Sequence, residues 1–156
     1  MMGNLKPGDT APDFELADQD GTTRRLADFR GKKLLLYFYP KANTPGCTLQ
    51  SCSVSRARED FLSLGVAVLG MSPDKPASQK RFDSLFHLGF PLLSDTEHKV
   101  AEAYGVWGGK SFMGKKFMGI IRSSFLMDED GKILQTWYKV SPGDTVPNVK
   151  SFLGKK

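Results

Sequence analysis

Two cysteines five positions apart, Cys47 and Cys52, are the residues of this sequence best suited to chemistry. Before them stand Thr44, a favoured helix cap, Pro45, which suits a first helical position, and Gly46, which lets a ligand approach the backbone. Cys47 then falls in the first turn of a helix, where unpaired N–H groups and the helix dipole favour an anion. We expect a reactive thiolate at Cys47, although a buried bystander cysteine could occupy the same position.

The spacing of the two cysteines constrains any bond between them. In a regular helix, five residues separate the Cα atoms by roughly 8.5 Å and about 140° around the axis. A disulfide needs Cα atoms within about 7 Å of each other. A Cys47–Cys52 bond therefore requires the first turns to unwind, and we expect redox-coupled local unfolding between residues 44 and 55. The alternative is that Cys52 is a cysteine packed in the core.

Composition describes a globular chain. With 156 residues, 40% of them hydrophobic, the sequence suits a single domain spanning 1–156. The net charge of +5 comes from scattered lysines and arginines, so neither a nucleic-acid partner nor a membrane is expected. The N-terminus lacks the apolar run of a signal peptide, and no stretch approaches the roughly 20 apolar residues of a membrane span. We therefore expect a cytoplasmic protein.

Strands and helices alternate around the cysteines. The continuous apolar run at 34–39, stopped by Pro40, predicts a central strand that delivers the chain to Cys47. A helix over 44–64 and a buried strand over 66–71 follow. This order predicts a right-handed crossover that joins two parallel strands of one sheet.

Hairpins are expected near both ends of the chain. Two short runs within 13–26 are joined by an Asp-Gly pair, and so are the runs 123–128 and 132–138. Further helices are predicted over 77–88, 97–104 and 146–153, with a short extended piece at 91–93. These elements predict an α/β class and a thioredoxin-like fold, in which helices flank a central mixed sheet and an N-terminal β-hairpin precedes it.

One segment, 107–119, breaks this pattern. Its glycines, methionines and phenylalanines suit a mobile, partly apolar loop better than a regular element. We expect this loop beside the active site.

The two histidines invite a zinc interpretation that their spacing disfavours. His87 and His98 are separated by ten residues, against three to five in a zinc finger. Both fall in predicted helices with no local signature of a Cys-His nucleophile pair. We expect no metal and no organic cofactor.

The motif PxxxTPGC, from Pro40 to Cys47, resembles the active site of the peroxiredoxins. The second cysteine, Cys52, is similar to that of the Q-type branch, also called the bacterioferritin comigratory proteins. The resemblance covers nearly the whole chain, from KPGDTAPDFEL, which opens at Lys6, to MGIIRSSFLMDEDGKI, which ends at Ile133.

This resemblance implies a role for each site residue. Cys47 would be the peroxidatic cysteine and Cys52 the resolving one. Thr44 would donate a hydrogen bond to the peroxide oxygen, Pro45 would shield the thiolate from water, and Arg122 would stabilise the thiolate and the developing charge. A fixed cation and a hydroxyl donor aimed at the leaving oxygen act mainly in the transition state. Attack leaves a sulfenic acid, which a thiol converts to a disulfide before irreversible oxidation.

The sequence departs from the branch at one point. Gln50-Ser51 stands where Glu-Ala usually precedes the second cysteine. The departure bears on a minor interaction of the first helical turn and leaves the core of the motif intact.

The leading hypothesis is a peroxidase that reduces hydrogen peroxide or organic hydroperoxides to water or alcohols. The resemblance implies thioredoxin or a similar dithiol as the reductant, and an intramolecular resolving cysteine favours a monomer. One alternative is a protein disulfide oxidoreductase, although such enzymes usually have two residues between their cysteines rather than the four found here. Another alternative is a redox-sensing switch, which would be oxidised once rather than turn over peroxide.

Overall fold

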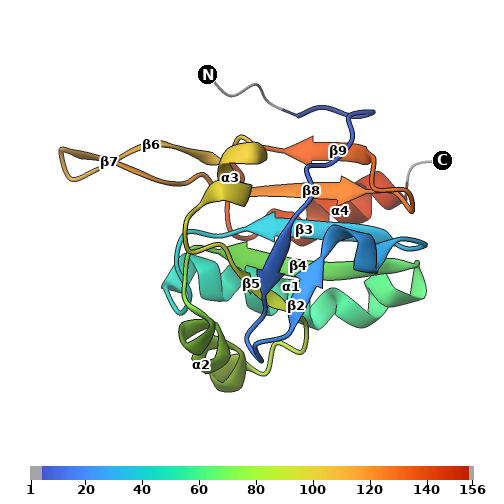
Figure 1. The fold of residues 1–156 in the computed structure, drawn as a ribbon, viewed down its shortest axis with the longest axis horizontal. Helices are drawn as coiled ribbons and strands as arrows, with labels where there is room; N and C mark the ends of the chain where they lie inside the picture. The colour runs from blue at the N-terminus through green and yellow to red at the C-terminus, as the bar shows by residue number, and fades with distance from the viewer. Residues whose placement is uncertain (1–4, 155–156) are drawn as a thin grey trace.

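A five-stranded mixed sheet forms the centre of the molecule (Figure 1). The computed structural model describes residues 5–154; residues 1–4, part of the segment judged above for a signal peptide, and 155–156 lie outside it. The strands are β3 (Lys33–Phe38), β4 (Val66–Ser72), β5 (Leu92–Ser94), β8 (Ser123–Met127) and β9 (Ile133–Trp137), in the order β5-β4-β3-β8-β9. β3 is parallel to β4 and antiparallel to β8. β8 pairs antiparallel with β9, so the predicted parallel pair of strands and the C-terminal hairpin are confirmed.

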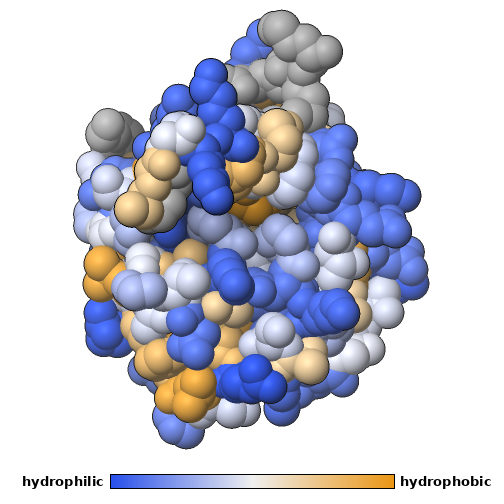
Figure 2. Space-filling model, turned by 90° about the vertical axis from the view of Figure 1, so that its left-hand side faces the viewer, coloured by the Kyte–Doolittle hydropathy of each residue, from blue (hydrophilic) through white to orange (hydrophobic). Residues whose placement is uncertain are grey.

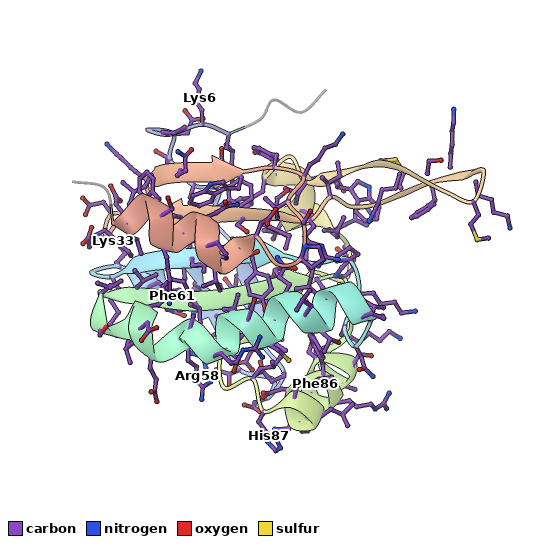
Figure 3. The ribbon with its side chains drawn as sticks, turned by 180° about the vertical axis from the view of Figure 1, so that it is seen from behind. Lys6, Lys33, Arg58, Phe61, Phe86 and His87 are labelled. Carbon is purple, nitrogen blue, oxygen red and sulfur yellow. The ribbon has the colours of Figure 1, made fainter. Side chains whose placement is uncertain are left out.

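Helices cover both faces of this sheet. They are α1 (Pro45–Ser63), α2 (Pro76–Phe86), α3 (Lys99–Ala103), α4 (Thr145–Leu153) and a 3-10 turn, η1 (Leu26–Phe29). Seen from behind, α1 and α4 lie across the same face (Figure 3). The predicted helices are confirmed, with α3 shorter than expected. No helix within residues 5–154 is long and apolar enough to cross a membrane.

β3 supplies both halves of the core because its side chains alternate between the two faces. Leu35 and Tyr37 pack with the apolar residues of α1 and α4, whereas Leu34, Leu36 and Phe38 pack with α3 and the segment that follows it. All five side chains are buried. The continuous apolar run at 34–39 thus reflects a central strand that is covered on both faces, as predicted.

The N-terminal hairpin is confirmed as β1 (Glu15–Ala17) paired antiparallel with β2 (Thr23–Arg25). Its turn is held by Asp18, whose Oδ1 accepts the backbone N–H groups of Asp20 and Thr22. Gln19 then fastens the hairpin to the body, because its amide bonds backbone groups on either side of Pro91.

The prediction of a loop over 107–119 is wrong. The segment forms a second hairpin, β6 (Trp107–Phe112) with β7 (Lys115–Ile120), which extends away from the body (Figure 1). The two turn residues, Met113 and Gly114, both have positive φ, as in the tight turns that match the twist of a β-ribbon. A projecting ribbon needs no buried face, so its strands lack the alternation of apolar and polar residues that marks a strand in sequence.

Candidate active site

Cys47 lies in the first turn of α1, as the sequence predicts. β3 ends at Phe38, and a short loop leads to Thr44, whose extended backbone precedes the first helical residue, Pro45. The thiol is almost completely enclosed, with 1% of Cys47 exposed. The unpaired N–H groups of this turn and the positive end of the helix dipole surround a buried sulfur, which is an arrangement that favours an anion.

Arg122, which lies just before the strand next to β3, contacts this sulfur. It directly precedes β8, and the register places Ser123 opposite Phe38, so the start of β8 adjoins the end of β3. Its Nη2 lies 3.5 Å from Cys47 Sγ. The pairing of β3 with β8 thus brings together two residues 75 positions apart.

Gly46 provides the space for this contact. A Cβ at this position would lie 3.1 Å from Arg122 Nη2 and 3.2 Å from Cγ of Pro142. Contacts of this length force a neighbour to move, and the neighbour here is the guanidinium beside the sulfur. A side chain at Gly46 would therefore require Arg122 or Pro142 to shift by a few tenths of an ångström, which would disturb the contact with Cys47.

The hydroxyl of Thr44 is not aimed at the helix or at the sulfur. It donates to the carbonyl oxygen of Lys41 at 2.8 Å, and the predicted cap position carries no side-chain capping bond. Donation to a bound peroxide would require this hydroxyl to rotate away from Lys41. Pro45, the first residue of α1, is exposed.

Cys52 is half-buried, and both cysteines are free thiols. α1 runs as a regular helix through both positions, so its geometry keeps their Cα atoms roughly 8.5 Å apart. The side chain of Cys52 packs against the apolar cluster that contains Cys47. The site is thus in a conformation in which the two sulfurs cannot bond, as the spacing predicts.

Two buried hydroxyl groups are hydrogen-bonded to each other next to the cysteines, one on β3 and one on α1. The Tyr37 hydroxyl and Ser51 Oγ lie 2.7 Å apart, and both side chains are fully buried. Burial raises the pKa of Tyr37 far above its usual range; the hydrogen bond to Ser51 opposes this, and negative charge on Cys47 or Cys52 adds to it. Tyr37 therefore stays protonated beneath both cysteines. Sequence analysis missed this pair because a tyrosine within an apolar strand looks like an ordinary core residue.

The β6–β7 hairpin adds a second cation. Lys110 folds across Gly119, and its Nζ donates to the carbonyl oxygen of Ile120 at 2.8 Å. Partial burial lowers the pKa of Lys110, the charge of Arg122 lowers it further, and Cys47 raises it. β7 ends at Ile120, two residues before Arg122, so the base of the hairpin lies beside the site, as predicted for this segment. Figure 2, which faces the side toward which the hairpin extends, shows hydrophilic and apolar residues interspersed there.

The two histidines lie at helix ends rather than inside helices, contrary to the prediction. His87 ends α2 and His98 precedes α3, both with left-handed backbone. His98 stacks on Trp107, with ring centroids 3.8 Å apart. Within residues 5–154, no group of three or more His, Cys, Asp or Glu side chains is placed to hold a metal ion.

The model of the AhpC/TSA family matches residues 7–136 of the sequence. This chain belongs to the AhpC/TSA family. Within the family, it is 54% identical to peroxiredoxin Bcp of Escherichia coli over 132 residues, which are 85% of each chain. It is 45% identical to peroxiredoxin Bcp of Bacillus subtilis over 142 residues, 91% of this chain and 90% of that protein. The chain is thus a peroxiredoxin of the Bcp, or Q-type, branch.

Solved structures confirm the thioredoxin-like fold of this peroxiredoxin. Peroxiredoxin Q of Xanthomonas campestris superposes with a TM-score of 0.86 at 32% identity, over 97% of this chain and 96% of that one. Peroxidoxin BcpB of Mycobacterium tuberculosis gives a TM-score of 0.85 at 34% identity, over 96% and 97% of the two chains. The chain is accordingly a Bcp-type thiol peroxidase that reduces peroxides, and its two cysteines are consistent with an intramolecular disulfide mechanism.

Proposed function

We propose that this peroxiredoxin reduces hydrogen peroxide and organic hydroperoxides through attack of the Cys47 thiolate on the O–O bond. The observation that carries the proposal is the 3.5 Å contact between Arg122 Nη2 and Cys47 Sγ in the first turn of α1. The sulfur takes the terminal oxygen and becomes a sulfenic acid. The O–O bond breaks, and the leaving oxygen takes a proton to give water or an alcohol.

Two guanidinium properties suit Arg122 to this step. It remains charged at any pH at which the enzyme works, and it presents several N–H donors in a fixed plane. As negative charge moves from sulfur to the leaving oxygen, a donor already in place stabilises the transition state without rearrangement. Thr44 and Pro45 complete the site in this proposal: Thr44 bonds the peroxide once its hydroxyl turns from Lys41, and Pro45 keeps water from the thiolate.

Cys52 completes the cycle by attacking the sulfenic sulfur of Cys47. Hydroxide leaves and is protonated to water, and a Cys47–Cys52 disulfide forms. Since the regular helix keeps the Cα atoms beyond bonding distance, residues 44–55 must unwind before the bond closes. A dithiol protein such as thioredoxin then reduces the disulfide. Because one chain and one domain would supply both cysteines, we propose a monomer, acting in the cytoplasm.

The proposed substrate range rests on exposed apolar side chains at the start of α1 and on a relative. The bacterioferritin comigratory protein of Xanthomonas campestris, 31% identical over 98% of this chain, is described for its alkyl peroxide reduction activity. In this chain, Pro45 and Leu49 are exposed at the start of α1, and Leu49 is 51% exposed. These apolar surfaces would accept an alkyl chain while the peroxide group enters toward Cys47.

Peroxide consumption coupled to thioredoxin and its reductase tests the mechanism. We expect Cys47→Ser to abolish turnover, and Cys52→Ser to form one sulfenic acid per chain and then stop. Ser63→Ala, at the exposed end of α1, is the matched control and should keep full activity. Normal peroxide turnover by Cys47→Ser would overturn the proposal. Insulin reduction without peroxide would favour a disulfide oxidoreductase, and a single oxidation of the wild type without turnover would favour a switch.

A further inference from the structure

Gln50 holds the guanidinium that contacts the reactive sulfur. It lies three residues after Cys47, so both side chains project from neighbouring positions on α1. Its Oε1 accepts a hydrogen bond of 2.6 Å from Arg122 Nη1, while Nη2 of the same guanidinium lies 3.5 Å from Cys47 Sγ. The planar guanidinium of Arg122 therefore contacts both the amide of Gln50 and the sulfur of Cys47.

The orientation of the amide is fixed by its partners. Arg122 can only donate, so the amide oxygen must face it, and Nε2 then donates to Thr145 Oγ1 at 3.0 Å. Thr145 Oγ1 also accepts from Ser124 Oγ at 3.4 Å. Gln50, Thr145 and Ser124 are all fully buried. The helix α1, the first residue of α4 and the strand β8 thus meet at one satisfied polar network.

This network carries no negative charge. Among the residues that the structure describes, 5–154, no carboxylate lies within ion-pair distance of Arg122. Arg24 offers a contrast, since its guanidinium pairs with the Asp18 carboxylate at 2.9 Å. A carboxylate on Arg122 would form a stronger, charge-assisted bond and would compete with Cys47 for the same positive charge.

We propose that Gln50 is a positioning residue that fixes Arg122 through a neutral hydrogen bond and so leaves the guanidinium charge to the Cys47 thiolate. The proposal concerns the Gln50–Arg122 contact of this chain. It rests on the proposed function, in which Arg122 stabilises the thiolate and the transition state. Gln50 acts through Arg122 and need not touch the peroxide.

Gln50→Glu separates the charge from the hydrogen bond, because the carboxylate has nearly the shape of the amide and still accepts from Arg122. We expect the second-order rate constant with hydrogen peroxide at pH 7 to fall about three- to tenfold. In a Cys52→Ser background, the pH profile of Cys47 alkylation by iodoacetamide should move to higher pH. Gln135→Glu, on β9 and outside this network, adds the same charge as a matched control and should change neither measurement.

Gln50→Leu provides a second variant that removes the hold on Arg122 without adding charge. We expect it to lower the rate with peroxide while moving the alkylation profile less than Gln50→Glu does. The inference is overturned if Gln50→Glu keeps both the wild-type rate and the wild-type profile, or if the two variants behave alike. It is also overturned if Gln50→Glu does not fold and Gln50→Leu matches the wild type. Failure of the proposed function is distinguishable, because Cys47→Ser would then retain turnover.

Discussion

The two halves of α1 are held to the same sheet by different forces. Residues 45–55, which carry both cysteines, are fastened mainly by polar contacts: Gln50 bonds Arg122 and Thr145, Ser51 bonds Tyr37, and Ser55 donates to the carbonyl oxygen of Leu88. Residues 56–63 are fastened by apolar burial of Ala57 and Phe61.

This difference decides which half can unwind. A hydrogen bond contributes about 0.5–1.5 kcal/mol net, up to about 3 kcal/mol when one partner is charged, because water replaces it when it breaks. Burial of a large apolar side chain contributes about 1.5–3 kcal/mol, and nothing in water replaces it. The first half can therefore open to join Cys47 to Cys52 while the second half stays packed on the sheet.

Phe61→Ala should give the largest loss of stability, since it empties the apolar contact of the second half. Phe61 is fully buried on α1 (Figure 3), so we expect a loss of about 3–5 kcal/mol in the free energy of unfolding. Urea unfolding measures it, and activity per folded molecule should not change. Leu62→Ala, next to it but 60% exposed, is the control and should change stability by less than about 0.5 kcal/mol. A smaller loss for Phe61→Ala than for Tyr37→Phe would reverse the comparison.

Tyr37→Phe tests the polar half. The substitution removes the Tyr37 hydroxyl, which lies 2.7 Å from Ser51 Oγ. The Ser51 hydroxyl then lacks this partner in the wound helix, whereas it can bond water once the helix unwinds. We expect unwinding to become easier by about 1 kcal/mol, which makes disulfide formation after a peroxide pulse about fivefold faster. Rapid quenching with a thiol label follows the reaction.

Tyr39→Phe is the matched control for this experiment. Its hydroxyl donates to Gln79 Oε1, on α2, and has no bond to α1. Disulfide formation should keep the wild-type rate in Tyr39→Phe. Slower or unchanged disulfide formation in Tyr37→Phe would show that the buried hydroxyl pair does not restrain the first half.

Lys110→Met tests the effect of the positive charge of Lys110, on the β6–β7 hairpin, on the first half of α1. We expect about a threefold lower rate constant with peroxide at pH 7, because one of two cations near Cys47 is lost. Burial and the charge of Arg122 lower the pKa of Lys110 below the usual 10.5, and Cys47 opposes this shift. The wild-type lysine is charged below that lowered pKa and loses its charge as the pH rises through it.

The ratio of wild-type to Lys110→Met rate constants should therefore fall toward one before pH 10.5 is reached. Lys115→Met, exposed near the turn of the hairpin, should match the wild type throughout. A ratio that stays constant from pH 7 to 10.5 would contradict the assignment of a charge effect to Lys110.

Lys150→Ala should have the smallest effect. Lys150 on α4 pairs with Asp60 in the second half of α1 at 3.0 Å, but both side chains are exposed. Exposed pairs contribute less than about 1 kcal/mol, so the urea midpoint should hardly move. A loss above about 2 kcal/mol would mean that ion pairing, rather than apolar burial, holds the second half.

The elements of the fold that are determined by residues close together in the sequence could be predicted from it. The strand at 34–39, the helix starting after Thr44 and the strand at 66–71 follow from a continuous apolar run, a Thr-Pro-Gly start and the Gly65 stop. The β6–β7 hairpin was missed because backbone pairing forms it, and its exposed strands have no buried face to mark them in sequence.

The residues of the site also differ in whether a local sequence pattern reveals them. The position of Cys47 follows from helix-start chemistry, whereas Arg122 was found only through the resemblance to peroxiredoxins. The Gln50–Thr145 bond spans 95 positions, and no local pattern encodes it. Such contacts depend on which strand ends adjoin, and single-sequence reasoning does not supply that register.

Hydrogen exchange along α1 tests the central claim most directly, with reduced protein compared with protein oxidised by one equivalent of peroxide. We predict that oxidation removes protection from residues 44–55 and leaves residues 56–63 as protected as before. Identical protection of residues 44–55 in the two states would contradict the account, and so would a loss of protection along the whole helix.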